Sequence, residues 1–536
     1  MKKITILSLH LGVGGIEKYI SSLSKMLCDD YEIEMIITYK LKEVPSFNIN
    51  NKIKITYLID GGPNKDEIKK CIRRKKYFKL ITELFKAVKI LRLKKSRTKK
   101  ALKELDTDYL ITTRTYETKL ANKILKKSNI KLIATDHNYP SKKYKKELIK
   151  STTNYDRLIL VNSEIRDIYR KEIGLKAVSI NNFIDEISKE KSDLSTKNII
   201  AVGRLSKEKG FIDLIDIMSI IVKMDKDVKL TLVGDGEEKE NIQNRIKELK
   251  LENNIRLTGF LNQEEIRNEL LKSSIFCMTS LVESFGLVIL ESMNMGVPVV
   301  AFDSSVGPRV LLSDGKGILI KDRNKEEFAK CVIDLLNNNK VLKRFANNAK
   351  KSVEEYTPDV IKKEWLSLLK EVGNCSRKRV MFISSTGGHL NEMLMLKSMF
   401  NKYNYSLITE NTESNKNLKN KYGRKRVGMM IFGTRKHMFT YVFKIIMNSF
   451  RSLYYYIKFR PQYIISTGAH TAGPMCLLGH ILGSKIIFIE TFANSETKTI
   501  TGSLVYKFAD LFIVQWESML DNYPDATFGG WIYWYL

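Results

Sequence analysis

The chain alternates short apolar runs with longer segments in which charged residues recur at helical spacing. Apolar runs of five or six residues between polar segments are typical of strands covered on both faces. Their alternation with helices predicts parallel α/β sheets. In the first two thirds of the chain the runs cover residues 4–9, 34–39, 131–135, 158–162, 198–202, 229–233, 275–279 and 297–302.

Two polar stretches interrupt this alternation, and a new strand pattern begins after each of them. They cover residues 186–196 (EISKEKSDLST) and 373–379 (GNCSRKR). A chain of 536 residues is long enough for three domains at about 100–200 residues each. We expect three Rossmann-like α/β domains, over residues 1–190, 191–358 and 378–536, with a helix at about 359–372 that returns to the first domain.

Charge and cysteine content narrow the classes of protein. Apolar residues make up 43% of the chain and charged residues 28%, which excludes a disordered or collagen-like chain. The formal net charge of +31 favours an anionic partner: nucleic acid, acidic lipid or phosphorylated small molecules. The six cysteines form no CxxC pair, so neither a zinc site nor a disulfide framework is expected, and a reducing cytoplasm fits. No apolar run reaches the roughly 18 residues needed to span a bilayer.

The second domain has glycine turns and charged residues directly after its strands. Gly203-Arg204-Leu205 follows one strand, with Lys209 shortly after it. Ser284, Phe285, Gly286 and Leu287 begin a helix, whose free N–H groups attract anions. Arg204 offers a planar fork for phosphate oxygens and Lys209 a point charge. This set suggests a site for a departing nucleoside diphosphate.

Two carboxylates flank the same helix start. Glu283 precedes the helix and Glu291 lies eight residues further along it. Eight residues of helix span about 12 Å, which is close to the distance from a hexose to the ribose of its nucleotide. The pair could accept hydrogen bonds from sugar hydroxyls at one end and from ribose hydroxyls at the other.

Residues 1–372 resemble the retaining family-4 glycosyltransferases of GT-B architecture. The shared motifs are E-x7-E at 283–291, GRL…KG at 203–210, GVPVV at 296–300, GGIEK at 14–18, the pair His137-Asn138 and NFID at 182–185. The resemblance implies two Rossmann-like domains facing a cleft, a nucleotide-sugar donor and transfer with retention. It also implies that no metal is needed, because cationic side chains and a helix N-terminus neutralise the leaving group. Asp106-Thr107-Asp108 imitates a metal motif, but its place ahead of a strand favours a solvated turn.

The resemblance also assigns roles to individual residues. Glu283 and His137 would be catalytic, with Glu283 holding the transferred sugar and His137 near the reacting carbon. Glu291 would hold the ribose. The other donor-binding residues would be Gly203, Arg204, Lys209, Ser284, Phe285, Gly286 and Leu287, and the acceptor side of the cleft would be lined by Gly14, Gly15, Glu17 and Asn138.

A basic segment lies within the first domain. Residues 69–103 contain 16 Lys or Arg and one acidic residue, Glu83, with apolar residues between them. An interfacial helix on an acidic membrane fits this composition. A solvated helix face and a nucleic-acid surface are the alternatives, but no recognised nucleic-acid-binding motif accompanies the segment.

The third domain repeats the strand–glycine turn–helix pattern of the first. Its motifs are STGGHL at 384–390, STGAHTAGP at 466–474, a strand that ends at Glu490, and a basic, aromatic helix over 435–459 without an acidic residue. That helix places Phe439, Phe443, Phe450 and Tyr454 with Lys444, Arg451 and Lys458. Aromatic rings with basic ends suit a lipid headgroup region, and packing on the sheet is the alternative.

This domain resembles PssD-type polysaccharide proteins. These are relatives of the acceptor-binding subunit of the two-piece N-acetylglucosaminyltransferase of dolichol-linked glycan synthesis, and more distantly of the N-terminal half of MurG. The resemblance implies a site for a lipid-linked acceptor and a separate subunit that supplies the donor. The matching positions are Gly387, Gly388, His389, Gly468, His470 and Glu490.

We therefore expect a fused glycosyltransferase of cell-surface polysaccharide assembly. The donor would be a UDP-hexose or UDP-N-acetylhexosamine and the acceptor a polyprenyl-diphosphate-linked oligosaccharide. The protein would be cytoplasmic and peripheral on the inner face of the membrane. The alternatives are a non-catalytic membrane scaffold and a nucleotide-sugar epimerase or sugar-phosphate synthase on the same fold.

Overall fold

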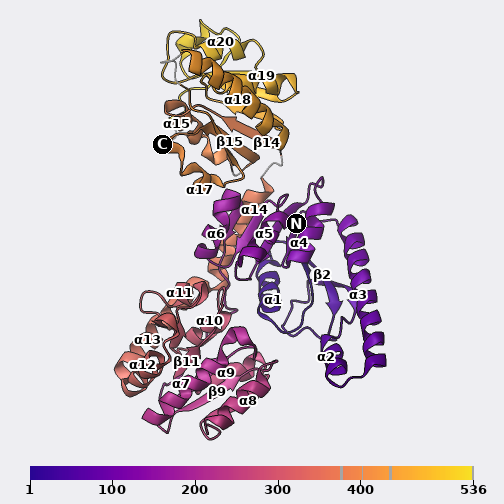
Figure 1. Cartoon of the computed structure of the whole chain (residues 1–536), viewed down its shortest axis with the longest axis vertical. Coiled ribbons are helices and arrows are strands. Elements are labelled where there is room, and N and C mark those ends of the chain that lie inside the picture. The colour runs from indigo at the N-terminus through magenta and orange to yellow at the C-terminus, as the bar shows by residue number, and fades with distance from the viewer. Residues whose placement is uncertain (375–377, 401, 434–437, 534–536) are drawn as a thin grey trace. The chain divides into compact units, whose positions relative to one another are not determined.

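The computed structural model describes residues 1–374, 378–400, 402–433 and 438–533. The described residues leave out Cys375 and the rest of 375–377, which belong to the expected linker at 373–379. They also leave out residue 435, where the basic helix was expected to begin, and the last residues of the third domain. The chain forms two compact units, residues 1–166 with 178–367, and residues 167–177 with 368–536. The chain folds into three parallel sheets that are covered by helices (Figure 1). The expected GT-B fold with an additional Rossmann-like domain is confirmed.

The first sheet has the strand order β3-β2-β1-β4-β5-β6-β7. Its core is apolar on both faces, as the short runs predicted: Ile4, Ile6, Leu110 and Ile133 are fully buried. The strands are β1 (Lys3–Ser8), β2 (Glu32–Lys40), β3 (Lys54–Asp60), β4 (Tyr109–Thr112), β5 (Lys131–Asp136), β6 (Arg157–Leu160) and β7 (Ala177–Ser179).

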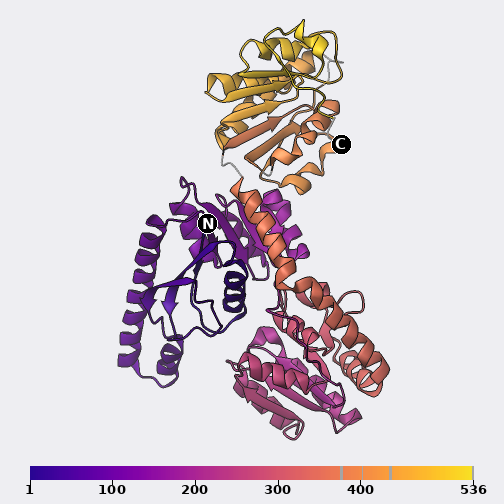
Figure 2. The same ribbon diagram turned by 180° about the vertical axis from the view of Figure 1, so that it is seen from behind.

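One helix of this domain is much longer than the others. The helix α3 runs along the edge of its domain in both views (Figures 1 and 2). Only Thr98 and Leu102, near its C-terminal end, are buried. The helices are α1 (Gly15–Leu27), α2 (Lys65–Arg73), α3 (Tyr77–Lys103), α4 (Thr115–Ile124), α5 (Lys142–Ser151), α6 (Ser163–Ile173) and the 3-10 helix η1 (Gly174–Lys176).

The second sheet has the order β10-β9-β8-β11-β12-β13 and belongs to the same compact unit. Its strands are β8 (Asn198–Val202), β9 (Lys229–Val233), β10 (Ile255–Gly259), β11 (Ile275–Met278), β12 (Val299–Phe302) and β13 (Ile318–Ile320). Its helices are η2 (Lys207–Lys209), α7 (Phe211–Met224), α8 (Lys239–Glu248), α9 (Gln263–Leu271), α10 (Leu287–Asn294), α11 (Val306–Leu312), η3 (Lys321–Arg323), α12 (Lys325–Asn337), α13 (Asn339–Ser352) and η4 (Val353–Tyr356).

The helix α14 (Pro358–Gly373) follows the second sheet and contacts the first domain. Lys362 forms an ion pair of 2.7 Å with Asp30, at the end of α1. Trp365 is fully buried and lies beside Tyr19 of α1. This is the position that the sequence predicted for a returning helix.

The third sheet has the order β16-β15-β14-β17-β18-β19-β20. Its strands are β14 (Arg379–Ile383), β15 (Asn404–Glu410), β16 (Val427–Met430), β17 (Tyr463–Ser466), β18 (Lys485–Ile489), β19 (Leu511–Val514) and β20 (Thr527–Phe528). Its helices are α15 (Gly388–Met395), α16 (Lys397–Phe400), η5 (Glu413–Asn415), α17 (Leu418–Tyr422), α18 (Met438–Phe459), α19 (Gly473–Ile481), α20 (Ile500–Tyr506) and η6 (Glu517–Leu520).

All three sheets reverse their strand order at the same place. The chain builds outward from β1, β8 or β14 in one direction and then continues on the other side with β4, β11 or β17. At such a reversal the loops at the carboxyl ends of the two central strands separate and leave room for a ligand. The fold therefore provides three candidate binding positions, and the sequence motifs lie at all three.

Candidate functional site

The expected donor side of the site is built on the loop after β8. Gly203 N–H donates to the Val233 carbonyl (3.0 Å) and Leu205 N–H to the Asp235 carbonyl (3.0 Å). At Gly234 the backbone has a φ of 144°, and an added Cβ would lie 1.9 Å from the Gly203 carbonyl oxygen. Only glycine fits at this close approach of two turns. The turn leaves Arg204 exposed at the carboxyl edge of the sheet.

Lys209 is directed toward the expected sugar end of the site. Its ammonium donates to Glu283 Oε2 at 2.5 Å, and both side chains are largely buried. Glu283 is itself held by the backbone, because its N–H donates to Ser305 Oγ (3.0 Å) and its carbonyl accepts from Gly307 N–H (3.0 Å). The sequence motifs at 203–210 and 283–291 are thus brought together by contact.

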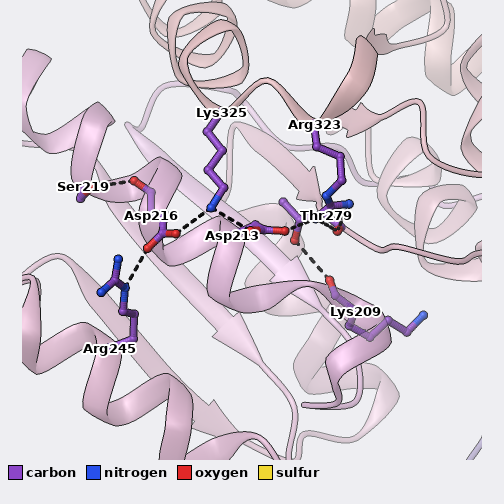
Figure 3. Close-up of polar contacts among 8 residues, drawn as sticks. All are labelled: Lys209, Asp213, Asp216, Ser219, Arg245, Thr279, Arg323 and Lys325. Atoms are coloured by element: carbon purple, nitrogen blue, oxygen red, sulfur yellow. Dashed lines mark hydrogen bonds and ion pairs between the residues drawn. The ribbon is translucent and has the colours of Figure 1, made fainter.

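A polar network behind Lys209 fixes the position of its loop (Figure 3). The Thr279 hydroxyl donates to the Lys209 carbonyl (3.2 Å), and Arg323 donates to the Thr279 carbonyl (3.1 Å). Arg323 and Lys325 both pair with Asp213 of α7. Burial acts to raise the pKa of Asp213, but its bonds to Lys325 and Arg323 outweigh burial and hold that pKa below its ordinary value. The charged end of Lys209 points away from this network.

The helix α10 begins at the expected anion site. Gly286 precedes it with a φ of 92°, a conformation that favours glycine. The Ser284 carbonyl, in the turn before the helix, accepts from the Asn162 amide (2.7 Å) after β6 of the first sheet. Phe285 is buried. An added Cβ at Gly15 would lie 3.9 Å from Leu287 Cδ1, so the first glycine loop and the start of α10 face each other.

Glu291 lies on α10 and is paired across the two sheet domains. Its carboxylate accepts from the Lys18 ammonium of α1. Burial opposes the charge of Lys18, but Glu291 outweighs it and the pKa of Lys18 is raised. Both carboxylates of the E-x7-E motif are therefore paired with lysines.

The expected acceptor side contains a buried carboxylate on α1. Glu17 is 2% exposed, pairs with Arg114 at the start of α4, and lies 3.5 Å from Nδ1 of His10. Gly14, the residue before α1, leaves room for this carboxylate, because an added Cβ would lie 2.2 Å from Glu17 Oε2. Burial lowers the pKa of His10. A fixed carboxylate of this kind can accept hydrogen bonds from hydroxyl groups of a ligand.

His137 lies at the end of β5, against Tyr19 of α1, with ring centroids 4.4 Å apart. Burial, and to a lesser extent the Arg114 charge, lower the pKa of His137 to about 3, so the imidazole is neutral at physiological pH. Its Nε2 is buried and has no hydrogen-bond partner among the described residues. A neutral imidazole with an unused nitrogen suits a hydrogen bond to a ligand.

Asn138 and Asp136 flank His137. The Asn138 amide donates to Asp136 Oδ1 (3.1 Å) and to the Tyr144 hydroxyl (2.9 Å), and that hydroxyl donates to Asp136 Oδ1 (2.5 Å). Burial raises the pKa of Asp136 to about 6, although these bonds favour its charged form. The Asn138 side chain is thus held by the protein itself.

In the third domain the two motif histidines follow β14 and β17, the strands between which the strand order reverses. His389 Nδ1 lies 2.8 Å from the Thr467 carbonyl oxygen. Gly468 has a φ of 94°, and an added Cβ there would lie 3.2 Å from the His389 ring. His470 Nε2 lies 3.4 Å from Glu410 Oε1, at the end of β15.

The remaining expected residues of this domain differ in what they contact. Gly387 has a φ of 75°, and an added Cβ at Gly387 or Gly388 would meet no atom within 4 Å, so this turn is open. Glu490 is 2% exposed, and both its carboxylate oxygens accept from Thr499 (3.0 Å each) while Oε2 also accepts from Tyr523 (3.0 Å). Its carboxylate is thus bonded within its own domain.

Four residues of these sites were given no role by the sequence analysis: Lys18, Asn162, Arg114 and Glu410. Lys18 ends the GGIEK motif and Glu410 follows a strand, so both had a local signal. Asn162 and Arg114 join elements far apart in the chain, and no local pattern marks them. Asp108 of the DTD turn accepts from the Lys3 N–H (2.8 Å). Within the described part of the chain, no group of three or more His, Cys, Asp or Glu residues could hold a metal ion.

Two family models match the chain. The model "Glycosyl transferases group 1" matches residues 182–352, and "Oligosaccharide biosynthesis protein Alg14 like" matches residues 380–532. The two matches cover the second and the third sheet domain.

Relatives are similar to about two thirds of the chain. An uncharacterized glycosyltransferase of Haemophilus influenzae is 27% identical over 379 residues, which are 69% of this chain and 100% of that protein. A Campylobacter jejuni enzyme named GalNAc-alpha-(1->4)-GalNAc-alpha-(1->3)-diNAcBac-PP-undecaprenol alpha-1,4-N-acetyl-D-galactosaminyltransferase is 26% identical over 386 residues, or 70% of this chain and 100% of that enzyme.

A solved structure shows the likeness of fold. A mutant of S. aureus TarM, in complex with fondaparinux, alpha-GlcNAc-glycerol and UDP, matches 69% of this chain and 99% of its own with a TM-score of 0.57 and 18% identity. The chain therefore has the GT-B fold, with a domain similar to the group 1 glycosyltransferases, joined to a domain similar to Alg14.

Proposed function

We propose that the first compact unit transfers a sugar, with retention, from a UDP-hexose or UDP-N-acetylhexosamine to a polyprenyl-diphosphate-linked oligosaccharide in cell-surface glycan assembly. The observation that carries this proposal is the arrangement around α10. Lys209 contacts Glu283 at the start of the helix, and Glu291 lies two turns further along. The Campylobacter relative, whose name includes an undecaprenol-linked acceptor, supports this acceptor class.

The chemistry follows from the charges at the site. As the bond between sugar and diphosphate breaks, negative charge develops on the leaving oxygen. Arg204, Lys209 and the N-terminus of α10 would stabilise it without a catalytic metal. Glu283 would hold hydroxyls of the transferred sugar and Glu291 those of the ribose. His137, being neutral, would take part by hydrogen bonding rather than by its charge.

An acidic membrane surface is the proposed location, on the cytoplasmic side, where a polyprenyl acceptor is anchored. The N-terminal part of α3 exposes large apolar side chains: Phe78 is 91% exposed and Phe85 74%. Residues 77–103 also carry ten Lys or Arg and one acidic residue. Exposed apolar residues between cations are typical of interfacial helices. No nucleic-acid partner is proposed.

The helix α18 provides a comparable surface on the second unit. Phe443 and Phe450 are each 65% exposed and Tyr454 57%. Lys444 and Lys458 lie on the same helix, and Arg451 donates to the Met429 carbonyl (3.0 Å). The Phe439 side chain lies outside the described residues. Among the residues that the structure describes, no helix is long and apolar enough to cross a membrane.

The Alg14-like domain is proposed to bind the acceptor for a second transfer and to recruit a separate donor-binding subunit. Its support is the family match and the open turn at Gly387 and Gly388, which His389 follows directly. Two additions to one lipid-linked glycan would account for the fusion.

The test is product analysis with membranes that contain the whole chain. They are supplied with UDP- and GDP-sugars, and lipid-linked products are weighed by mass spectrometry. We expect one added sugar mass with one donor, and at least a hundredfold loss of product in Glu283→Gln, in the range reported for removal of one transition-state contact. Glu252→Gln, an exposed residue of the same domain, is the matched control.

Three results would contradict the proposal. Full activity in Glu283→Gln would mean that the Glu283 carboxylate is not needed for sugar transfer. Transfer to a soluble sugar phosphate alone would favour the synthase alternative. No product with any donor, in membranes that carry the acceptor, would favour the scaffold.

A further inference from the structure

The imidazole of His10 is held by the backbone through one of its nitrogens. His10 lies two residues after β1, at the carboxyl edge of the first sheet. Its Nδ1 accepts a hydrogen bond from Gly12 N–H (3.2 Å). Because a backbone N–H only donates, Nδ1 has the lone pair, and in the neutral ring Nε2 carries the proton. The short loop after β1 therefore determines the tautomer of His10.

The same loop keeps the ring in place. An added Cβ at Gly12 would lie 3.4 Å from Nδ1 and 3.8 Å from Cε1 of His10, so the ring packs directly against this glycine. Glu17 Oε1 lies 3.5 Å from Nδ1, which is long for a hydrogen bond, and this carboxylate is itself paired with Arg114. The ring is thus confined between a glycine of the loop and a fixed carboxylate of α1.

The surroundings of His10 favour its neutral form. Burial lowers the pKa of the imidazole, the Glu17 charge acts against this, and the Arg114 charge adds to the lowering. Because the pKa lies below the ordinary 6.5, the ring is neutral at physiological pH. It then has one proton to donate, on Nε2.

This proton has no acceptor within the described part of the protein. The polar contacts of His10 there are all made by Nδ1 or face it. The side chain is 21% exposed, and its Nε2, unlike that of His137, is not buried. The Nε2–H group is thus an oriented hydrogen-bond donor that a ligand can reach.

Neighbouring residues place this donor on the expected acceptor side. His10, Arg114 and His137 directly follow or lie close after β1, β4 and β5, which are adjacent strands. The Arg114 charge acts on the pKa of both histidines, so these side chains share one edge of the sheet. The glycine loop after His10 also reaches the second sheet domain, since an added Cβ at Gly15 would lie 3.9 Å from Leu287 Cδ1.

We propose that His10 is an acceptor-binding residue of the first transfer, whose Nε2–H donates a hydrogen bond to a hydroxyl oxygen of the acceptor sugar. The inference rests on the proposed function of the first compact unit. Glu17, beside the ring, would accept from a neighbouring hydroxyl of the same sugar. A donor and an acceptor side by side suit a sugar, which offers both groups at each hydroxyl. A phosphate oxygen fits less well, because the Glu17 carboxylate can only accept.

The first test is the tautomer of His10, which needs no substrate. Long-range 1H–15N NMR at pH 7.5 on the whole chain with labelled histidine reports which nitrogen is protonated. The chain has six histidines, and the signal that is lost in His10→Gln belongs to His10. We expect a neutral ring with Nε2–H. An Nδ1–H ring, or a ring protonated at both nitrogens at this pH, would overturn the proposal.

The second test is the KM for the acceptor. The probe is the lipid-linked glycan extracted from membranes on which the wild type acts, together with the UDP-sugar that it uses. His10→Phe keeps a ring of similar size but removes the donor. We expect the KM for the acceptor to rise about three- to tenfold, in the range of one neutral hydrogen bond, with the KM for the UDP-sugar unchanged.

Two further variants separate the hydrogen bond from a general effect on the fold. The side-chain amide of Gln also offers an N–H donor, so His10→Gln should recover most of the acceptor affinity. His480→Phe, the same change at an exposed histidine of α19 in the second unit, is the matched control and should leave both KM values unchanged. An equal rise of both KM values in His10→Phe, without recovery in His10→Gln, would overturn the assignment.

The outcome also distinguishes this assignment from the function on which it rests. A wild-type chain that transfers no sugar would overturn the proposed function and the assignment with it. Transfer by the wild type with an unchanged acceptor KM in His10→Phe would overturn the assignment alone.

Discussion

At the scale of single residues, each carboxylate of the E-x7-E motif pairs with a lysine. Lys209 contacts Glu283, and Lys18 contacts Glu291 from the other sheet domain. In the proposed function Glu291 holds the ribose, so Lys18 would compete with the ribose hydroxyls for that carboxylate.

This contact predicts the effect of removing Lys18. Lys18→Met should lower the Kd for UDP by about two- to fivefold, since a partly buried pair of this kind is worth roughly 0.5–1 kcal/mol. Isothermal titration calorimetry measures it. Lys25→Met, an exposed lysine on the same helix, is the control and should leave the Kd unchanged. A weaker affinity in Lys18→Met would show that Lys18 assists the nucleotide instead.

A second residue-scale prediction concerns pH. The pKa of His137 is about 3 in the folded protein against an ordinary 6.5, so the unfolded chain binds more protons between these values. Stability from this residue is therefore complete above pH 6.5 and is lost as the pH falls toward 3. His137→Gln removes that dependence.

Thermal unfolding of both proteins at pH 7.5 and pH 5 measures the effect. Wild type should lose more stability than His137→Gln on going to pH 5. Asp136 has the opposite dependence, because its pKa is raised from 3.8 to about 6. It is present in both proteins, so the difference between them isolates His137. An equal loss would indicate a histidine that titrates normally.

At the scale of elements, α3 differs from the other helices of the first unit in what it leaves exposed. Its C-terminal part is attached to the domain: Lys94 pairs with Glu117 of α4 (3.2 Å), and Thr98 and Leu102 are buried. Its N-terminal part exposes apolar residues three, four or seven positions apart, which lie on one side of a helix. The same α4 begins after Arg114, which contacts Glu17. The helix α4 therefore contacts both α3, through Glu117, and the expected acceptor side, through Arg114.

We predict that Phe85→Ser weakens binding to vesicles of acidic phospholipid by about tenfold or more. Burial of a Phe side chain is worth about 1.5–3 kcal/mol, and this one is 74% exposed in the free protein. The thermal midpoint should hardly change. Cosedimentation at several salt concentrations is the measurement. Phe260→Ser, also at an exposed Phe (58%) in the second sheet domain, is the control, and an equal loss there would argue against a specific surface.

At the scale of the whole molecule, the chain has two compact units with separate candidate sites. The first contains the α10 site and the second contains the Glu410–His470 pair. No residue named in one site belongs to the other unit. The two proposed transfers should therefore be separable by mutation.

This separation gives a further prediction. With the donor-binding subunit and both donors present, Glu283→Gln should abolish the first addition but still extend an acceptor that already carries the first sugar. His470→Asn should stop after one sugar. Mass spectrometry of lipid-linked products distinguishes these species. If Glu283→Gln also failed to add the second sugar to the pre-extended acceptor, the second transfer would depend on the site of the first unit.

Much of this could be predicted from the sequence, because strands in parallel sheets are local apolar runs and glycine turns recur after them. The fold class, the three sheet domains and the Gly203–Lys209 and Glu283–Glu291 elements follow from such patterns. Edge strands were harder: β3 (KITYLID) mixes polar and apolar residues, because an edge strand is only partly buried.

What the sequence could not determine are the contacts between distant residues. Lys18 contacts Glu291, which is 273 residues away in the chain, and Asn162 contacts Ser284, which is 122 residues away. The sequence shows a glutamate at position 410, but it does not show that its carboxylate lies beside His470. The sequence by itself determined which elements form and which residue types end each strand, since both depend on local periodicity and turn conformation. Only the tertiary structure decided which charged groups meet, because pairing depends on how sheets and loops pack together.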